Sequence, residues 1–474
     1  MHRRSKRILT VIGVIVIAFG VLYVIALVRS TVKLRRAYAA LEADGRPMRA
    51  ADVIPPEVPD TQNAAVLYQS AALMLKGQAA GDKNLLERLG RLSDAIFQRP
   101  DDPDKIAQRQ QEMTELRQRM SEPVVASALA AVEQGTQRPA CQFDREYGGG
   151  LSNHMPFEQD LRNLIRVLGT RACLEAASGQ VPQAWTTVQT QLKFADALRS
   201  DPVTMSQWTR LGMIGYSSRI IQAMCETAPP DAETAQKIDA RLKDLADITP
   251  LVRALDGERL LIGEWLFNLP GEELDKLLRK DIFRKNNSTP EALQKVLYQL
   301  GFRILAFKPR LVADHAAYLN VMRVRVELLQ DSSYLSPTDS RKLLNPTTWD
   351  ALTSRLTNWT VGDKWVHARR AADLQMTRAG LALLQYKQAH GQFPPTLDAL
   401  GLDGLIDPYT GKPLLYRPEG EGFVVYSVGE DLKDNGGTPR PERQDPDPRH
   451  RKPVEYDLVW RFPNPANRIL AGNP

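Results

Sequence analysis

The chain has 474 residues, of which 43% are hydrophobic and 25% charged, with a net charge of +6 and a pI near 9.1. This composition is that of an ordinary globular protein, and it excludes a disordered, collagen-like or disulfide-dense chain. At about 150 residues per domain, the length suggests three units. A basic pI is also typical of nucleic-acid-binding proteins, so the position of the charges decides what it means.

The positive excess lies at the N-terminus. The first 36 residues contain eight Lys or Arg and no Asp or Glu, which leaves 54 basic and 56 acidic residues, a net −2, in the other 438. The body of the protein is therefore not basic, and we expect no nucleic-acid partner.

Residues 8–28 are uncharged and lie between two groups of basic residues. At 1.5 Å per residue, this run is long enough to cross the ~30 Å hydrocarbon core of a membrane. A cleaved signal peptide is the alternative, but small residues are missing before Arg29, which favours an uncleaved signal anchor. We therefore predict a cytoplasmic tail at 1–7, a transmembrane helix at 8–28 and a juxtamembrane stalk at 29–60.

Four Lys or Arg lie on each side of the apolar run, so side-chain charge does not set the orientation of the helix. The terminal amine favours a cytoplasmic N-terminus. The proline-rich segment 54–59 favours an extended backbone in the stalk.

Residues 61–358 have the pattern of an α-helical domain. Apolar residues recur at spacings of three and four, as at Leu161, Leu164 and Leu168. Five helix starts are indicated by a capping side chain directly before a proline, at Asp102, Asp201, Thr249, Thr289 and Ser336.

Residues 363–474 differ from the preceding domain. An apolar stripe that ends at Gly391 predicts a long amphipathic helix over 363–390. Strand-like segments follow at 413–416, 423–428 and 455–462. We therefore predict a mainly α protein with an N-terminal transmembrane helix, a helical-hairpin domain and a small C-terminal α+β module with an antiparallel sheet.

Three tracts of this C-terminal module resemble the type II secretion major pseudopilins. They are the helix end from Ala382 to Pro394, the turn and strand from Asp407 to Tyr416, and the next strand and loop from Phe423 to Asp431. The resemblance covers about 85 residues and implies a pseudopilin-like fold, an exported C-terminal body and a link to type II secretion-like machinery. Gly13 and Gly20 lack the Glu of a prepilin-peptidase site, so we interpret the module as a borrowed unit on a different anchor.

In the pseudopilin family, acidic residues in the loop after the last of these strands bind calcium. The resemblance places Asp431, Asp434 and Asp457 at these positions, and oxygen ligands with nearby glycines suit Ca²⁺. The alternative is an Asp/Asn/Gly turn in solvent. Calcium is the one cofactor that the sequence suggests.

Motifs of catalysis are absent from the sequence, including H-E-x-x-H, G-x-S-x-G and the phosphate-binding loop. Cys141, Asp144 and His154 could form a nucleophile and base, although chance proximity explains them as well. A second polar cluster, Glu258, Arg259 and Glu264, fits buried ion pairs or a solvated face. Cys173 has the surroundings of a buried thiol, and with Cys225 the count of three permits one disulfide without requiring it.

These observations favour a non-catalytic scaffold or interaction module of the bacterial envelope. We expect it to be single-pass in the inner membrane, with a cytoplasmic N-terminus, a periplasmic body and protein partners. The alternative is an envelope hydrolase with an unrecognised site in the helical domain.

Overall fold

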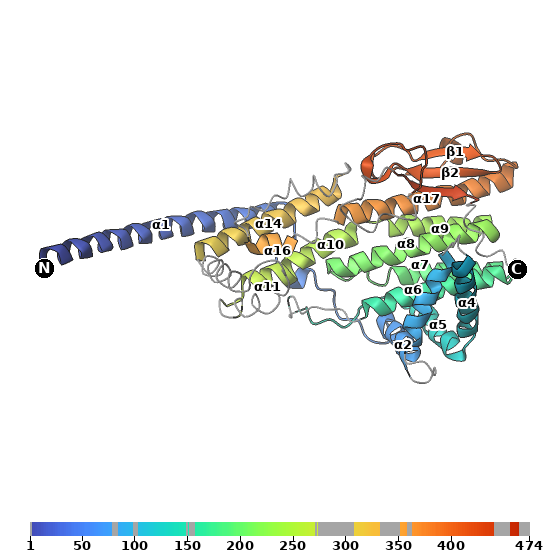
Figure 1. Cartoon of the computed structure of the whole chain (residues 1–474), viewed down its shortest axis with the longest axis horizontal. Helices are drawn as coiled ribbons and strands as arrows, with labels where there is room; N and C mark the ends of the chain where they lie inside the picture. Colours follow the sequence, from blue (N-terminus) through green and yellow to red (C-terminus); the bar gives the residue numbers. More distant parts are fainter. Residues whose placement is uncertain are drawn as a thin grey trace.

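The fold is mainly helical, with one long apolar helix at the N-terminus and a small three-stranded antiparallel sheet near the C-terminus (Figure 1), which confirms the predicted fold class. The computed structural model describes residues 2–77, 84–97, 103–147, 150, 157–270, 273, 308–331, 351–357, 363–439 and 456–463.

Helix α1 (His2–Ala43) is 42 residues long and extends from one end of the molecule (Figure 1). Most of its large apolar side chains between Val11 and Val28 are exposed, as Ile17 shows with 69% of its surface accessible. Among the described residues, α1 is the one helix that is long and apolar enough to cross a membrane. Apolar surface of this extent is stable only when lipid or protein covers it.

The C-terminal part of α1 is built into the body. Leu34, Ala37 and Leu41 lie on one side of the helix, and they belong to an apolar cluster shared with α14 (Lys308–Gln330), which runs alongside α1 (Figure 1). Residues 29–60 were expected to form a stalk. In the structure, they continue the helix to Ala43 and pack onto the body, because spacings of three and four give this part of α1 its own apolar stripe.

Polar contacts reinforce this junction. The Tyr38 hydroxyl donates to the Glu264 carboxylate at 2.8 and 3.0 Å, and His315 Nε2 lies 3.1 Å from the same group. Burial opposes ionisation of Glu264, but the hydrogen bonds from His315 and Tyr38 outweigh it and hold its pKa below the usual value. Just past the helix end, Arg46 forms an ion pair with Asp256.

The helical body contains antiparallel hairpins that share one large apolar cluster. The predicted helix starts at Asp102, Asp201 and Thr249 are followed by helices, whereas Thr289 and Ser336 lie outside the described residues. The α-helices that the structure describes between residues 64 and 357 are α2 (Ala64–Lys76), α3 (Leu85–Leu92), α4 (Pro103–Met120), α5 (Pro123–Gly135), α6 (Glu158–Ala177), α7 (Val181–Ala195), α8 (Thr204–Thr227), α9 (Ala232–Leu245), α10 (Thr249–Gly257), α11 (Glu264–Phe267), α14 and α16 (Ala351–Thr357).

A π-helical segment, η5 (Glu258–Gly263), joins α10 to α11. All six of its residues are buried, including Glu258 and Arg259. Arg325 on α14 lies between two carboxylates, 3.4 Å from Glu258 and 2.6 Å from Asp363. Because a buried guanidinium requires charged partners, these contacts fix α14 against η5 and against the long helix that begins at Asp363.

Helix α17 (Asp363–His390) has the bounds that the sequence predicts. After it come the short 3₁₀ helix η6 (Leu397–Leu400) and strands β1 (Leu415–Glu419), β2 (Gly422–Ser427) and β3 (Leu458–Phe462). Each strand overlaps a predicted one. The sheet has the order β1-β2-β3, and its buried central strand pairs Tyr426 with Leu415 and Phe423 with Phe462.

Helix α17 lies between the sheet and the layer formed by α8 and α9 (Figure 1). Its Arg378 pairs with Asp239 of α9 at 2.7 Å, whereas its Gly380 lies against Trp460 of β3. Buried residues of α17 and of the sheet belong to the same apolar cluster as those of α2 to α9. The segments 61–358 and 363–474, which the sequence suggests as separate units, therefore pack around a common core.

Candidate functional site

A groove of about 840 Å³ lies between α2 and α5 on one side and the ends of α7, α9 and α10 on the other. We call it the basic groove and define it by its five cationic side chains: Arg138, Lys193, Arg199, Arg241 and Arg253. Two carboxylates, those of Asp196 and Asp247, also line it. The lining thus carries three more positive than negative charges, in a body whose own balance is slightly negative.

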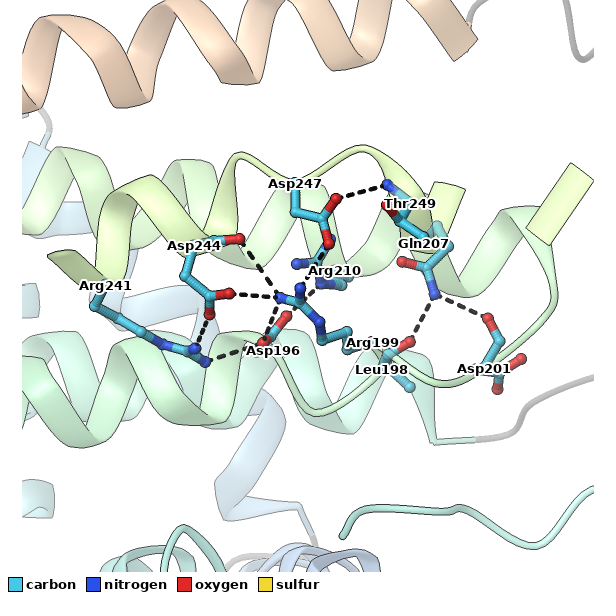
Figure 2. Close-up of polar contacts among 10 residues, drawn as sticks. All are labelled: Asp196, Leu198, Arg199, Asp201, Gln207, Arg210, Arg241, Asp244, Asp247 and Thr249. Carbon is cyan, nitrogen blue, oxygen red and sulfur yellow. Dashed lines mark hydrogen bonds and ion pairs between the residues drawn. The ribbon is translucent and has the colours of Figure 1, made fainter. Parts of the chain in front are cut away.

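Asp196, at the end of α7, is the centre of an ion network in the wall of the groove (Figure 2). It accepts from Arg210 Nε at 2.6 Å, from Arg241 Nη2 at 3.0 Å and from Arg199 Nη1 at 3.3 Å. Arg210, on α8, is only 1% exposed. Because a buried guanidinium is stable only beside a partner charge, this pair fixes the Asp196 carboxylate in place.

The same network reaches the start of α10. Arg199 Nη2 lies 2.7 Å from Asp247, and Asp247 accepts from the backbone N–H of Thr249 at 2.9 Å (Figure 2). Burial opposes ionisation of Asp247, but the hydrogen bonds from Thr249 outweigh it and lower its pKa. Asp244 on α9 completes the network through Arg199 and Arg241. Three Asp thus balance three Arg, and the ends of α7, α9 and α10 are held together.

The opposite wall is the extended segment before α2. Arg138 Nη1 donates to the carbonyls of Asp60 and Asn63, both at 2.7 Å, and Arg253 Nη2 donates to that of Val53 at 2.9 Å. Gln142 accepts from the Val58 N–H at 3.0 Å and donates to a neighbouring carbonyl of this segment. Side-chain donors therefore hold a proline-rich segment that has few amide donors of its own.

Among the described residues, three of the five groove cations have no acidic partner. Arg138 and Arg253 contact neutral carbonyls, and Lys193 is exposed on α7 with no ion pair or hydrogen bond from its ammonium to the residues described. Since Arg199 and Arg241 are balanced by the Asp residues of the network, the net positive charge of the groove belongs to Arg138, Lys193 and Arg253. This arrangement is suited to binding anionic groups.

No protein-family model, curated protein or solved structure matches this chain. The groove must be interpreted from its own chemistry. Sequence reasoning missed it, because its five cations come from four separated segments and no local motif connects them.

The predicted nucleophile and base are not assembled by the part of the chain that the structure describes. Cys141 lines the basic groove, and burial raises the pKa of its thiol, which keeps it protonated and weakly nucleophilic. Asp144 is exposed, and His154 lies outside the described residues. Cys173 and Cys225 are buried, and all three cysteines are free thiols.

The polar cluster at 258–264 forms buried ion pairs that point in different directions. Glu258 contacts Arg325 at 3.4 Å, whereas Glu264 faces Tyr38 and His315. Arg259 is 1% exposed and donates to the carbonyl of Pro47. These residues connect helices, and each of their charged groups faces a partner inside the protein.

Asp431 and Asp434 lie in the loop after β2, and Asp457, directly before β3, contacts the same loop. Asp457 accepts from the Gly437 N–H at 2.7 Å, Asp434 from the Tyr426 hydroxyl at 3.0 Å, and Asp431 from the Lys433 N–H at 3.0 Å. Within the described residues, no three His, Cys, Asp or Glu side chains are placed to share a metal ion. Donors of the loop occupy these carboxylates, and calcium binding here stays a prediction from the resemblance.

Proposed function

We propose that this protein is a non-catalytic scaffold of the bacterial envelope, anchored in the inner membrane by α1, with a cytoplasmic N-terminus and a periplasmic body. The observation that carries this proposal is the continuity of α1. Its exposed apolar part and its buried part, with Ala37 and Leu41 in the apolar cluster, form a single helix. Such a helix holds the body, and any surface on it, at a fixed orientation to the membrane.

The resemblance of residues 372–457 to pseudopilins supports a link to type II secretion-like machinery. It also supports export of the body, because pseudopilin globular domains lie outside the cytoplasm. The basic groove supports a binding role, since charged side chains of several elements line a concave surface, and three of the positive charges have no acidic partner in the part of the chain that the structure describes.

Orientation is tested by fusing alkaline phosphatase, which is active only outside the cytoplasm, to the C-terminus of the full chain. We expect the fusion to be active and to be found in the membrane fraction. After deletion of residues 2–28, the fusion should lose both its phosphatase activity and its association with the membrane. A fusion to a reporter that works only in the cytoplasm should be inactive. The opposite pattern would place the body in the cytoplasm and contradict the proposal.

The scaffold role is tested in cells with a photoreactive amino acid at exposed surface positions of the full chain. We expect discrete protein adducts that disappear when residues 2–28 are replaced by a cleaved signal peptide, because the released body loses its fixed orientation. Absence of adducts at every position would contradict the proposal. If Cys141→Ser folded normally and gave the same adducts but behaved in cells like a deletion of the whole protein, a hydrolase would be indicated instead.

A further inference from the structure

We propose that the basic groove binds an extended acidic segment of a protein partner, an inference that rests on the scaffold function proposed above. The groove combines three uncompensated cations, apolar side chains between them and a rigid wall. Each of these features favours an acidic peptide over other anionic ligands.

The charges are the first argument. Arg138, Lys193 and Arg253 come from three segments, after α5, on α7 and on α10, so they line different walls of the groove. Arg138 and Arg253 contact only carbonyl oxygens among the described residues, and their full positive charge remains. Carboxylates spaced along a peptide are the partners that such separated charges attract.

The lining between these cations is the second argument. Pro56, Val58 and Pro139 line the groove and keep accessible apolar surface, and its volume of about 840 Å³ is at the upper end for a small-molecule site. An inorganic anion would leave these apolar side chains in contact with water. A peptide in which acidic and apolar residues alternate would satisfy both kinds of surface.

The ion network supplies the third argument, because it holds the groove in shape before a ligand arrives. Asp196 and Asp247 fix Arg199 and Arg241, and the buried Arg210 fixes Asp196. A site whose side chains are already ordered loses less conformational entropy on binding than a flexible one.

The position of the groove argues against lipid headgroups. Helix α1 continues for about 22 Å after Val28 at 1.5 Å per residue before it ends at Ala43. Of the elements that line the groove, α2, α7 and α9 lie beyond that end, on the side away from the N-terminus (Figure 1). This distance exceeds the Debye length of about 8 Å at physiological salt, so the groove is out of reach of the membrane surface charge.

The test measures fluorescence anisotropy of a labelled octapeptide of alternating Glu and Val, with the full chain in a neutral detergent. The Gln/Val peptide is the control ligand. We expect the Glu peptide to bind at least about tenfold more tightly, and its affinity to fall as salt rises. Lys193→Glu should weaken binding by at least about fivefold, because an attractive charge becomes repulsive. Lys193 is exposed, so this variant should keep the melting temperature of the parent.

Lys105→Glu is the matched control, because Lys105 is exposed on α4 and does not line the groove. The affinity of Lys105→Glu for the Glu peptide should stay within about twofold of that of the parent protein. Equal effects of the two variants, or equal binding of the Glu and Gln peptides, would overturn the proposal. Displacement of the peptide by an equal concentration of short-chain phosphatidylglycerol would also overturn it, in favour of lipid. Adducts in cells that persist in Lys193→Glu would leave the scaffold function standing without this groove.

Discussion

At the scale of single residues, the environment of His367 on α17 makes the free energy of unfolding depend on pH. Burial, together with the nearby positive charges of Arg210 and Lys364, lowers the pKa of His367 to about 4. The unfolded chain protonates this imidazole near pH 6.5, whereas the folded chain does so only near pH 4. Between these values the unfolded state binds more protons, so stability falls as the pH falls.

We expect this histidine to contribute a loss of up to about 1.4 kcal/mol of unfolding free energy per pH unit between pH 6.5 and 4. His367→Gln should remove this contribution, because the amide does not titrate. Urea unfolding at several pH values in this window measures both slopes. Identical slopes in the two proteins would show that His367 is protonated equally in both states.

The cysteines allow a second prediction at this scale. Burial raises the pKa of all three thiols, and Cys173 and Cys225 are 1% exposed, whereas Cys141 is partly accessible in the groove. Thiolate is the reactive form, so at pH 8 a thiol reagent should react slowly with Cys141 and spare the other two. In denaturant without reductant, all three should react. Detection of a single thiol there would indicate a disulfide.

At the scale of elements, α17 is packed on both sides, and Gly380 is where it approaches the sheet most closely. A Cβ at this position would lie 1.8 Å from the ring of Trp460, which is fully buried in β3. We expect Gly380→Ala to destabilise the protein by about 1–3 kcal/mol, because the helix and the sheet must separate.

Gly212 provides the matched control for this prediction. It lies inside α8, is exposed, and has open space around its Cα. Gly212→Ala should stabilise the protein by about 0.5–1 kcal/mol through the higher helix propensity of alanine. Thermal unfolding followed by circular dichroism compares the two variants. A stabilised Gly380→Ala would mean that α17 and the sheet are not in contact.

Helix α17 also shows how far the sequence predicts the fold. Its bounds follow from the apolar stripe and from Gly391, and these signals are local. The burial of the α17 face that meets α9 does not follow from local signals. Arg378 on this face is a charged residue in the sequence, and its pairing with Asp239 of α9 is what allows it to be buried. A helical pattern indicates which face is apolar, whereas the partners of buried charges depend on the tertiary structure.

The basic groove was missed for a similar reason. Lys193 and Arg199 are both cations near the end of α7, and nothing in the sequence distinguishes them. The structure shows that Arg199 is balanced by Asp residues from α7 and α9 and from the link to α10, whereas Lys193 has no such partner among the residues described. A net charge along the chain therefore gives no prediction of where uncompensated charge lies in space.

At the scale of the whole molecule, α1 joins a segment that is long and apolar enough to span a membrane to a segment that belongs to the core. Most residues from Thr10 to Val28 are exposed, whereas Ala37, Tyr38 and Leu41 pack against the body. A chain that begins at residue 29 should therefore keep the fold and become soluble without detergent. A chain that begins at residue 44 should lose part of the core.

We expect the chain from residue 44 to be less stable than the chain from residue 29 by at least about 3 kcal/mol. Leu41 is fully buried, and the loss of a buried leucine side chain alone lowers the unfolding free energy by about 2–5 kcal/mol. The chain from residue 44 also lacks Tyr38, so the buried Glu264 carboxylate loses one of the hydrogen-bond donors that stabilise its charged form. Urea unfolding of the two chains under the same conditions measures this difference. Equal stabilities would mean that α1 is only an anchor, and the fixed orientation on which the scaffold function depends would then have no structural basis.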